Sequence, residues 1–103
     1  MEESLLKILL GGVKLREQVS FDEMLEQFDN GIYLIKFDQT TLPNWAGTLT
    51  SYSQVVITKQ SSANVFIEIM EGDVNLKHFR VIYSRSSSSI KSVYEYPVQK
   101  LTI

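Results

Sequence analysis

The chain has 103 residues with ten Lys or Arg, twelve Asp or Glu, one His and no Cys, which gives a net charge of −2. This length fits one domain with a single core, and the lack of cysteine excludes disulfides, thiolate metal sites and a cysteine nucleophile. No apolar stretch approaches the roughly 20 residues that span a bilayer, and Glu2 and Glu3 argue against a secretory signal. We therefore expect a cytoplasmic protein that does not insert into membranes.

The charges are unevenly distributed along the chain. Residues 1–73 hold five Lys or Arg against eleven Asp or Glu, a net charge of −6, whereas residues 74–103 hold five against one, a net charge of +4. The two halves either form separate functional faces or neutralise each other in the folded domain. Neutralisation is the more common outcome, because halves of a sequence are not halves of a structure.

Residues 2–10 carry a wide apolar stripe at helical spacing, which Gly11 and Gly12 end. A competing interpretation makes the two glycines the turn of a hairpin between residues 6–10 and 13–19. We prefer a helix over residues 2–10, because Leu and Lys favour helix over strand. The stripe then packs on the domain or forms a homodimer through Leu5, Leu6 and Leu9.

The clearest pattern in the sequence predicts a second helix over residues 20–30. Ser20 and Glu23 have the spacing of a capping box, and Val19 and Met24 have that of a hydrophobic staple. Asn30 and Gly31 supply a stop. The residues before this helix, 13–18, form a connector or a short edge strand. The apolar face of the helix consists of Phe21, Met24, Leu25 and Phe28.

After residue 31 the period of the sequence changes from that of a helix to that of strands. Runs of β-branched and aromatic residues, separated by Gly, Pro, Asn and Ser, predict strands at 32–38, 48–59, 65–70, 75–85 and 90–96, with a further candidate at 98–103. Helices followed by sequential strands indicate an α+β fold. We expect two N-terminal helices packed on a curled antiparallel sheet, or on a small barrel, of four to six strands in meander order.

The residue types that catalysis requires are sparse. His78 is the only histidine, so triads and paired-histidine metal sites are improbable. Glu68, Glu71 and Asp73 flank a turn and have oxygen ligands for a hard cation, but the spacing of a calcium loop is absent. Neither a phosphate-binding loop nor a Gly-x-Ser-x-Gly motif occurs. We expect no enzyme, no cofactor and no metal.

A protein-interaction module is the leading hypothesis after this elimination. Trp45, in a loop that begins at Pro43, is either an anchor for a partner or a core residue. Asp22, Glu26 and Asp29 share the polar face of the second helix and suit a basic partner. The expected function is an adaptor, regulator or inhibitor that docks on a larger macromolecule, by analogy with small inhibitors encoded by phages.

Single-stranded nucleic acid is the alternative partner. Bases stack on aromatic rings while basic side chains neutralise phosphates, so a basic aromatic sheet can bind a single strand. The acidic remainder of the chain repels phosphate and argues against this alternative. The residues that would carry it are Lys77, Arg80, Arg85, Tyr94 and Tyr96.

Overall fold

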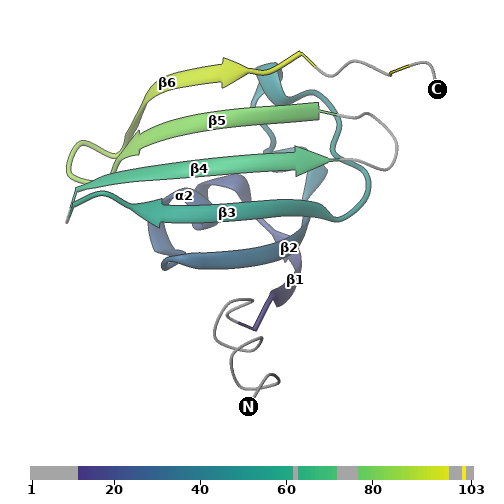
Figure 1. The fold of residues 1–103 in the computed structure, drawn as a ribbon, viewed down its shortest axis with the longest axis horizontal. Coiled ribbons are helices and arrows are strands. Elements are labelled where there is room, and N and C mark those ends of the chain that lie inside the picture. Colours follow the sequence, from purple (N-terminus) through teal and green to yellow (C-terminus); the bar gives the residue numbers. More distant parts are fainter. Residues whose placement is uncertain (1–11, 62, 72–76, 98–100, 102–103) are drawn as a thin grey trace.

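The computed structural model contains a six-stranded sheet in which the strands lie in the order of the sequence, from β1 to β6 (Figure 1). It describes residues 12–61, 63–71, 77–97 and 101. Helix α2 and two 3-10 turns, η1 and η2, join the strands on one side of the sheet. The elements are β1 (Lys14–Val19), α2 (Phe21–Gln27), β2 (Gly31–Phe37), η1 (Gln39–Thr41), η2 (Asn44–Ala46), β3 (Ser53–Lys59), β4 (Asn64–Glu71), β5 (Lys77–Ser84) and β6 (Ser89–Glu95).

The sheet is mixed, because β1 runs parallel to β2 while every later neighbour is antiparallel. A parallel pair needs a crossover, and α2 supplies it. The expected fold of two helices on an antiparallel sheet or barrel is therefore wrong. Within the ranges that the structure describes, α2 is the single α-helix. The helix predicted at residues 2–10 lies outside the described residues, as does most of the candidate strand at 98–103.

Helix α2 begins where the sequence indicates. The Glu23 N–H donates to the Ser20 Oγ at 3.1 Å, and Phe21, Met24 and Leu25 are buried. The first-turn N–H of Phe21 donates to the Thr41 Oγ1 at 3.1 Å, so η1 shares in the capping. The helix ends at Gln27, earlier than the predicted residue 30, because the backbone is already extended at Phe28.

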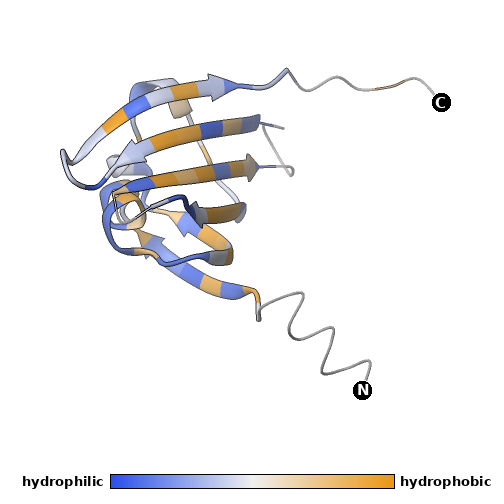
Figure 2. Cartoon of the chain, turned by 60° about the vertical axis from the view of Figure 1, so that its left-hand side comes forward, coloured by the Kyte–Doolittle hydropathy of each residue, from blue (hydrophilic) through white to orange (hydrophobic). Residues whose placement is uncertain are grey.

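The two faces of the sheet differ in what covers them. Alternate residues of β2 to β5 point into the core, where α2 and the loop with η1 and η2 lie behind the sheet in Figure 1. The bands of alternating hydropathy along the strands follow this pattern (Figure 2). Strands β4 and β5 contribute the centre of this buried face: Val65, Ile67, Ile69, Phe79, Val81 and Tyr83.

The loop between β2 and β3 takes residues that were expected in a strand. The predicted strand at 48–59 begins only at Ser53, because Leu49 is buried against the core and its backbone is bound by a side chain. The Leu49 N–H donates to the Gln39 Oε1 at 3.0 Å, and the Gln39 amide donates back to the Leu49 carbonyl. These two hydrogen bonds satisfy the backbone N–H and C=O of Leu49, which in a strand would pair with a neighbouring strand.

Both edge strands are irregular. In β1 the pairing with β2 shifts between Glu17 and Val19, where Gln18 has a φ of 55°. In β6, Ile90 pairs with Tyr83 and Ser92 pairs with Ile82, so Lys91 is an extra residue. Bulges and charges of this kind discourage edge-to-edge pairing with another sheet.

Candidate functional site

The second face of the sheet, which we call the open face, is formed by rows of side chains that run across β2 to β6. In the strand register, Ile32 pairs with Val56, Val56 with Glu68, Glu68 with Arg80, and Arg80 with Tyr94. A second row contains Leu34, Gln54, Met70, His78 and Tyr96, and a third contains Thr58, Phe66, Ile82 and Ser92.

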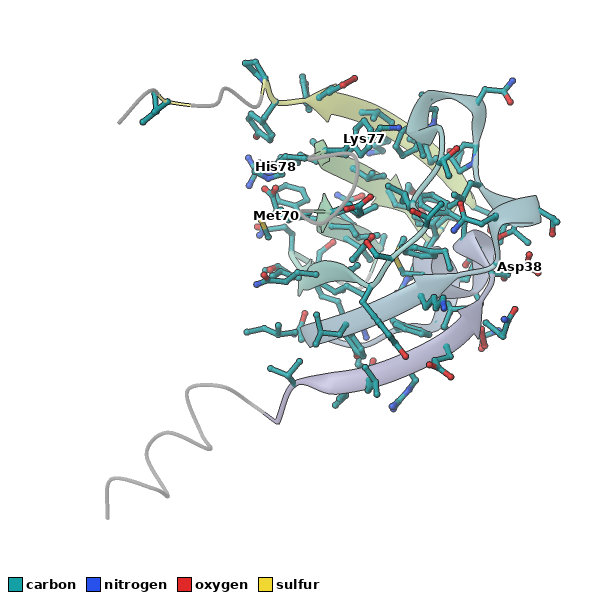
Figure 3. The ribbon with its side chains drawn as sticks, turned by 90° about the vertical axis from the view of Figure 1, so that its right-hand side faces the viewer. Asp38, Met70, Lys77 and His78 are labelled. Carbon is teal, nitrogen blue, oxygen red and sulfur yellow. The ribbon has the colours of Figure 1, made fainter. Side chains whose placement is uncertain are left out.

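Three ionisable side chains meet at the centre of the open face. The carboxylate of Glu68, on β4, lies 2.7 Å from the His78 Nε2 and 3.0 Å from the Arg80 Nε. All three are half-buried. Figure 3 places His78 and Met70 together on the side of the sheet away from Asp38. Glu68 lies on β4, and His78 and Arg80 lie on the neighbouring strand β5. The negative charge of the Glu68 carboxylate therefore compensates the positive charge of the Arg80 guanidinium.

Aromatic rings enclose this cluster. The Arg80 guanidinium lies over the Phe66 ring at 5.6 Å, within the range of a cation–π contact. The imidazole of His78 packs on the Tyr96 ring with centroids 4.5 Å apart. Tyr94 and Tyr96 keep 53% and 38% of their surface exposed. The centre and the β6 side of the open face therefore present accessible rings around a compensated charge cluster.

Of the acidic residues predicted to share a helix face, Asp22 and Glu26 lie four positions apart on α2, and Asp29 lies outside the helix. Asp22 is exposed on α2, whereas Glu26 accepts a hydrogen bond from the Tyr83 hydroxyl. That bond, with one from Ser88, lowers the pKa of Glu26. Asp29 lies beyond the end of α2 and pairs with the Lys59 Nζ at 2.9 Å, which lowers the pKa of Asp29.

Trp45 lies on the covered side of the sheet. Its ring packs edge-on against Phe21, with centroids 5.6 Å apart, and against Phe79, with centroids 5.2 Å apart. It is half-buried beside the hydrophobic core. In this position Trp45 joins η2 to α2 and β5, and it lies on the opposite side of the sheet from the rows of the open face.

The basic residues predicted for nucleic-acid binding are also divided. The Lys77 Nζ donates to the Ala46 carbonyl at 3.0 Å, beneath η2. Arg85 follows β5 and donates to the Leu25 carbonyl at 2.9 Å and to the Phe28 carbonyl at 2.6 Å. Only Arg80 of the three basic residues lies on the open face, where it joins Tyr94 and Tyr96.

Sequence reasoning did not select Phe66, Met70 and Ile82 as candidate site residues, although all three lie half-buried on the open face. The alternation of residues along β4 indicated Phe66 and Met70, and that along β5 indicated Ile82. Phe66 and Met70 flank Glu68 on one side of a strand whose other side buries Val65, Ile67 and Ile69 before it ends at Glu71. A strand with apolar side chains on both faces is typical of a sheet whose second face meets another surface.

Other classes of site receive little support from the geometry. Glu68 lies on the open face and Glu71 is buried on the other, so they do not converge, and Asp73 lies outside the described residues. Within the described part of the chain, no three His, Asp or Glu side chains gather as metal ligands would. Nor does that part contain a helix with the length and apolarity to cross a membrane. Scans of protein-family models, of curated proteins and of solved structures found no match to this chain.

Proposed function

We propose that the chain is a small non-catalytic protein-interaction module, an adaptor, regulator or inhibitor, that binds its partner protein through the open face. The observation that carries the proposal is the group of accessible rings, Tyr94 and Tyr96, around the compensated cluster of Glu68, His78 and Arg80. Tyrosine and arginine are the residue types that dominate binding energy at protein interfaces. The lack of cysteine agrees with a place in the cytoplasm.

The charge of the open face favours a protein over a nucleic acid. Arg80 is neutralised by Glu68, and Lys77 and Arg85 donate to backbone carbonyls elsewhere. A phosphate backbone needs several uncompensated cations, because most of its affinity comes from the release of counterions. A protein with an apolar, weakly charged surface pays a smaller free-energy cost of desolvation than a nucleic acid does. It also gains contacts with the tyrosine rings and with Ile82 and Met70.

The acidic residues of α2 are less suited to docking. Glu26 and Asp29 already have partners within the domain, Tyr83 and Lys59. A partner that approached these carboxylates would have to replace those contacts. Docking on the open face leaves the hydrogen bonds between α2 and β5 intact, because the helix lies on the other side of the sheet (Figure 1).

The experiment begins with a photo-reactive amino acid at Tyr94 in the full chain, which captures the partner in the cells that produce the protein. The captured protein is then purified, and its affinity for the unmodified chain is measured by calorimetry. We expect Tyr94→Ala and Tyr96→Ala each to weaken binding by about tenfold or more, the usual effect at an interface hot spot. Both side chains are exposed, so the variants are expected to fold.

Asp22→Lys on α2 is the matched control, because it changes an exposed residue on the opposite side of the sheet. We expect it to bind as the unmodified chain does. Loss of binding in Asp22→Lys with full binding in both tyrosine variants would overturn the proposal and assign docking to the acidic helix.

Single-stranded nucleic acid is the second candidate, since Arg80, Tyr94 and Tyr96 do share the open face. A mobility-shift assay at low salt with mixed oligonucleotides tests it. Retention of an oligonucleotide that is lost in Arg80→Ala would favour this candidate over a protein partner. We expect no retention, because the carboxylate of Glu68 lies against the guanidinium.

A further inference from the structure

The single histidine of the chain, His78, lies within the open face. It stands beside Met70 of the neighbouring strand (Figure 3). Its side chain keeps 32% of its surface exposed, so the imidazole reaches water and can exchange protons with it. Histidine is the side chain whose charge ordinarily changes between about pH 5 and about pH 8. The charge of the open face therefore depends on the pH near neutrality.

The contacts of His78 define which of its two nitrogens takes up a proton. Its Nε2 lies 2.7 Å from the Glu68 Oε2. An ionised carboxylate only accepts hydrogen bonds, so Nε2 carries the hydrogen of the neutral imidazole and donates it. Nδ1 is then the nitrogen that gains a proton when the pH falls. The carboxylate and the ring of Tyr96 both attract a cation, so the imidazolium can keep the same place on the open face.

The titratable and charged groups that face His78 come from three parts of the described chain. They are Glu68 of β4, Arg80 of β5, and Tyr94 and Tyr96 of β6 and the residue after it. Tyrosines carry no charge near neutral pH. The single negative charge of Glu68 is already matched by Arg80, so the group has no net charge while His78 is neutral. Protonation of His78 raises the net charge to +1.

We infer that protonation of His78 weakens docking at the open face, so that the partner binds more tightly when the imidazole is neutral. The inference rests on the proposed function, because it concerns the regulation of the same site. A docked partner excludes water from the cluster, and a charge that loses its water without full compensation costs free energy. Docking therefore releases a proton from His78, and by linkage the affinity falls as the pH falls through the range of histidine.

The contact between His78 and Tyr96 connects protonation directly to the docking surface. The two rings have centroids 4.5 Å apart, and the Tyr96 N–H donates to the His78 carbonyl at 2.9 Å. A partner that covers the Tyr96 ring therefore also removes water from the imidazole beside it. The pH then acts on the binding surface itself and needs no change of fold.

The test measures the affinity of the captured partner for the full chain by calorimetry at about pH 7.5 and about pH 5.5, on either side of the ordinary range of histidine. We expect the affinity to be about fivefold or more lower at the acidic pH, which is the lower end of coupling between two sites. His78→Gln keeps an N–H donor for Glu68 but does not titrate, so its affinity should change less between the two conditions. Titrating groups of the partner affect both chains equally and cancel in this comparison.

Gln27 provides a matched control, because it is exposed at the end of α2 on the other side of the sheet. The double variant of His78→Gln and Gln27→His keeps one histidine in the chain but moves it away from the open face. We expect this variant to respond to pH no more than His78→Gln does. A double variant that regains the pH dependence would overturn the inference, because the net charge of the whole chain would then be sufficient.

Equal pH dependence in the unmodified chain and in His78→Gln would also overturn the inference. A nuclear magnetic resonance titration of the free chain needs no partner, and we expect the imidazole resonances of His78 to shift between about pH 5 and about pH 8. Constant resonances over that range would overturn the inference as well. The proposed function has a separate readout, the affinity of Tyr94→Ala and Tyr96→Ala at about pH 7.5. Weakened binding in those variants together with equal pH dependence would overturn this inference alone, whereas full binding in both would count against the proposed function.

Discussion

At the scale of single residues, the hydrogen bond between Tyr83 and Glu26 links β5 to the helix. Tyr83 is only 4% exposed, and its hydroxyl donates to the Glu26 carboxylate. Burial, followed by the bond to Glu26, raises the pKa of Tyr83 from 10.0 to about 12. The tyrosine therefore keeps its proton in the folded chain over a range in which the unfolded chain loses it.

This difference predicts how stability changes at high pH. The contribution of Tyr83 is complete below the unfolded pKa and is lost as the pH rises from there toward about 12, because the unfolded state binds fewer protons over that range. We expect the urea midpoint to fall between about pH 9 and about pH 11, and to fall less in Tyr83→Phe. Tyr94→Phe, which changes an exposed tyrosine, should retain the original slope. An unchanged slope in Tyr83→Phe would contradict the prediction.

A second residue-scale prediction concerns Gly47, which follows η2 with a φ of 65°. A Cβ at this position meets the Lys77 Nζ, which donates to the Ala46 carbonyl. We expect Gly47→Ala to lower the free energy of unfolding by about 1–3 kcal/mol from its backbone conformation alone (φ 65°, ψ −131°), with a further loss from the lysine. Gly12→Ala is the control, since Gly12 has a φ of +60° with nothing within 4 Å of a Cβ. If both variants lose the same free energy of unfolding in a denaturant titration, the Lys77 side chain moves away from the new methyl group without a cost in stability.

The residue scale is also where prediction of the site from sequence was least successful. Lys77 and Arg80 differ by an odd number of positions, and strand alternation alone assigns them to opposite faces. The contacts of Arg85 depend on where β5 ends relative to the carbonyls of Leu25 and Phe28, which is tertiary information. The carboxylate of Glu68 on β4 reaches His78 and Arg80 only because of the register of the two strands.

At the scale of elements, α2 depends on β5 for its C-terminal end. The helix has no basic residue in its last turn, and Phe28 after it has an extended backbone. The Arg85 guanidinium supplies the missing donors. We expect Arg85→Met to lower the free energy of unfolding by about 1.5–3 kcal/mol, the range for hydrogen bonds that involve a charged group. The control, Arg16→Met on the exposed β1 edge, should change it little. Similar effects of the two variants in urea titrations would contradict the role assigned to Arg85.

The elements differ in how well their sequences specify them. Helix α2 has a capping residue, and its apolar residues recur at helical spacing on one face. Because these features indicate the same helix, the local sequence specifies where it starts. Strand β1 is mostly exposed and carries Lys14, Arg16 and Glu17, so its sequence lacks a sustained apolar alternation. The sequence therefore predicted no more than a connector or a short edge strand at this place. Its parallel direction depends on the crossover through α2, which no local pattern encodes.

At the scale of the whole molecule, we expect the irregular edges of the sheet to disfavour association through the edge strands. Lys91 is an extra residue in β6 between two regular pairs, Ile90 with Tyr83 and Ser92 with Ile82. Deletion of Lys91 leaves those pairs in register and removes the bulge. We expect the deletion variant to self-associate in sedimentation experiments at concentrations at which the unmodified chain does not, since a flat edge strand pairs readily. Lys91→Ala keeps the residue count and should behave as the unmodified chain does. Unchanged sedimentation of the deletion variant would show that the bulge does not protect the edge.

The strand order has a consequence for how the chain acquires its structure. Each strand after β1 is hydrogen-bonded to the strand before it in the sequence. No pairing therefore joins the two ends of the chain, which limits the loop-closure entropy that each pairing costs. We therefore expect each strand after β1 to have its pairing partner already synthesised when it leaves the ribosome.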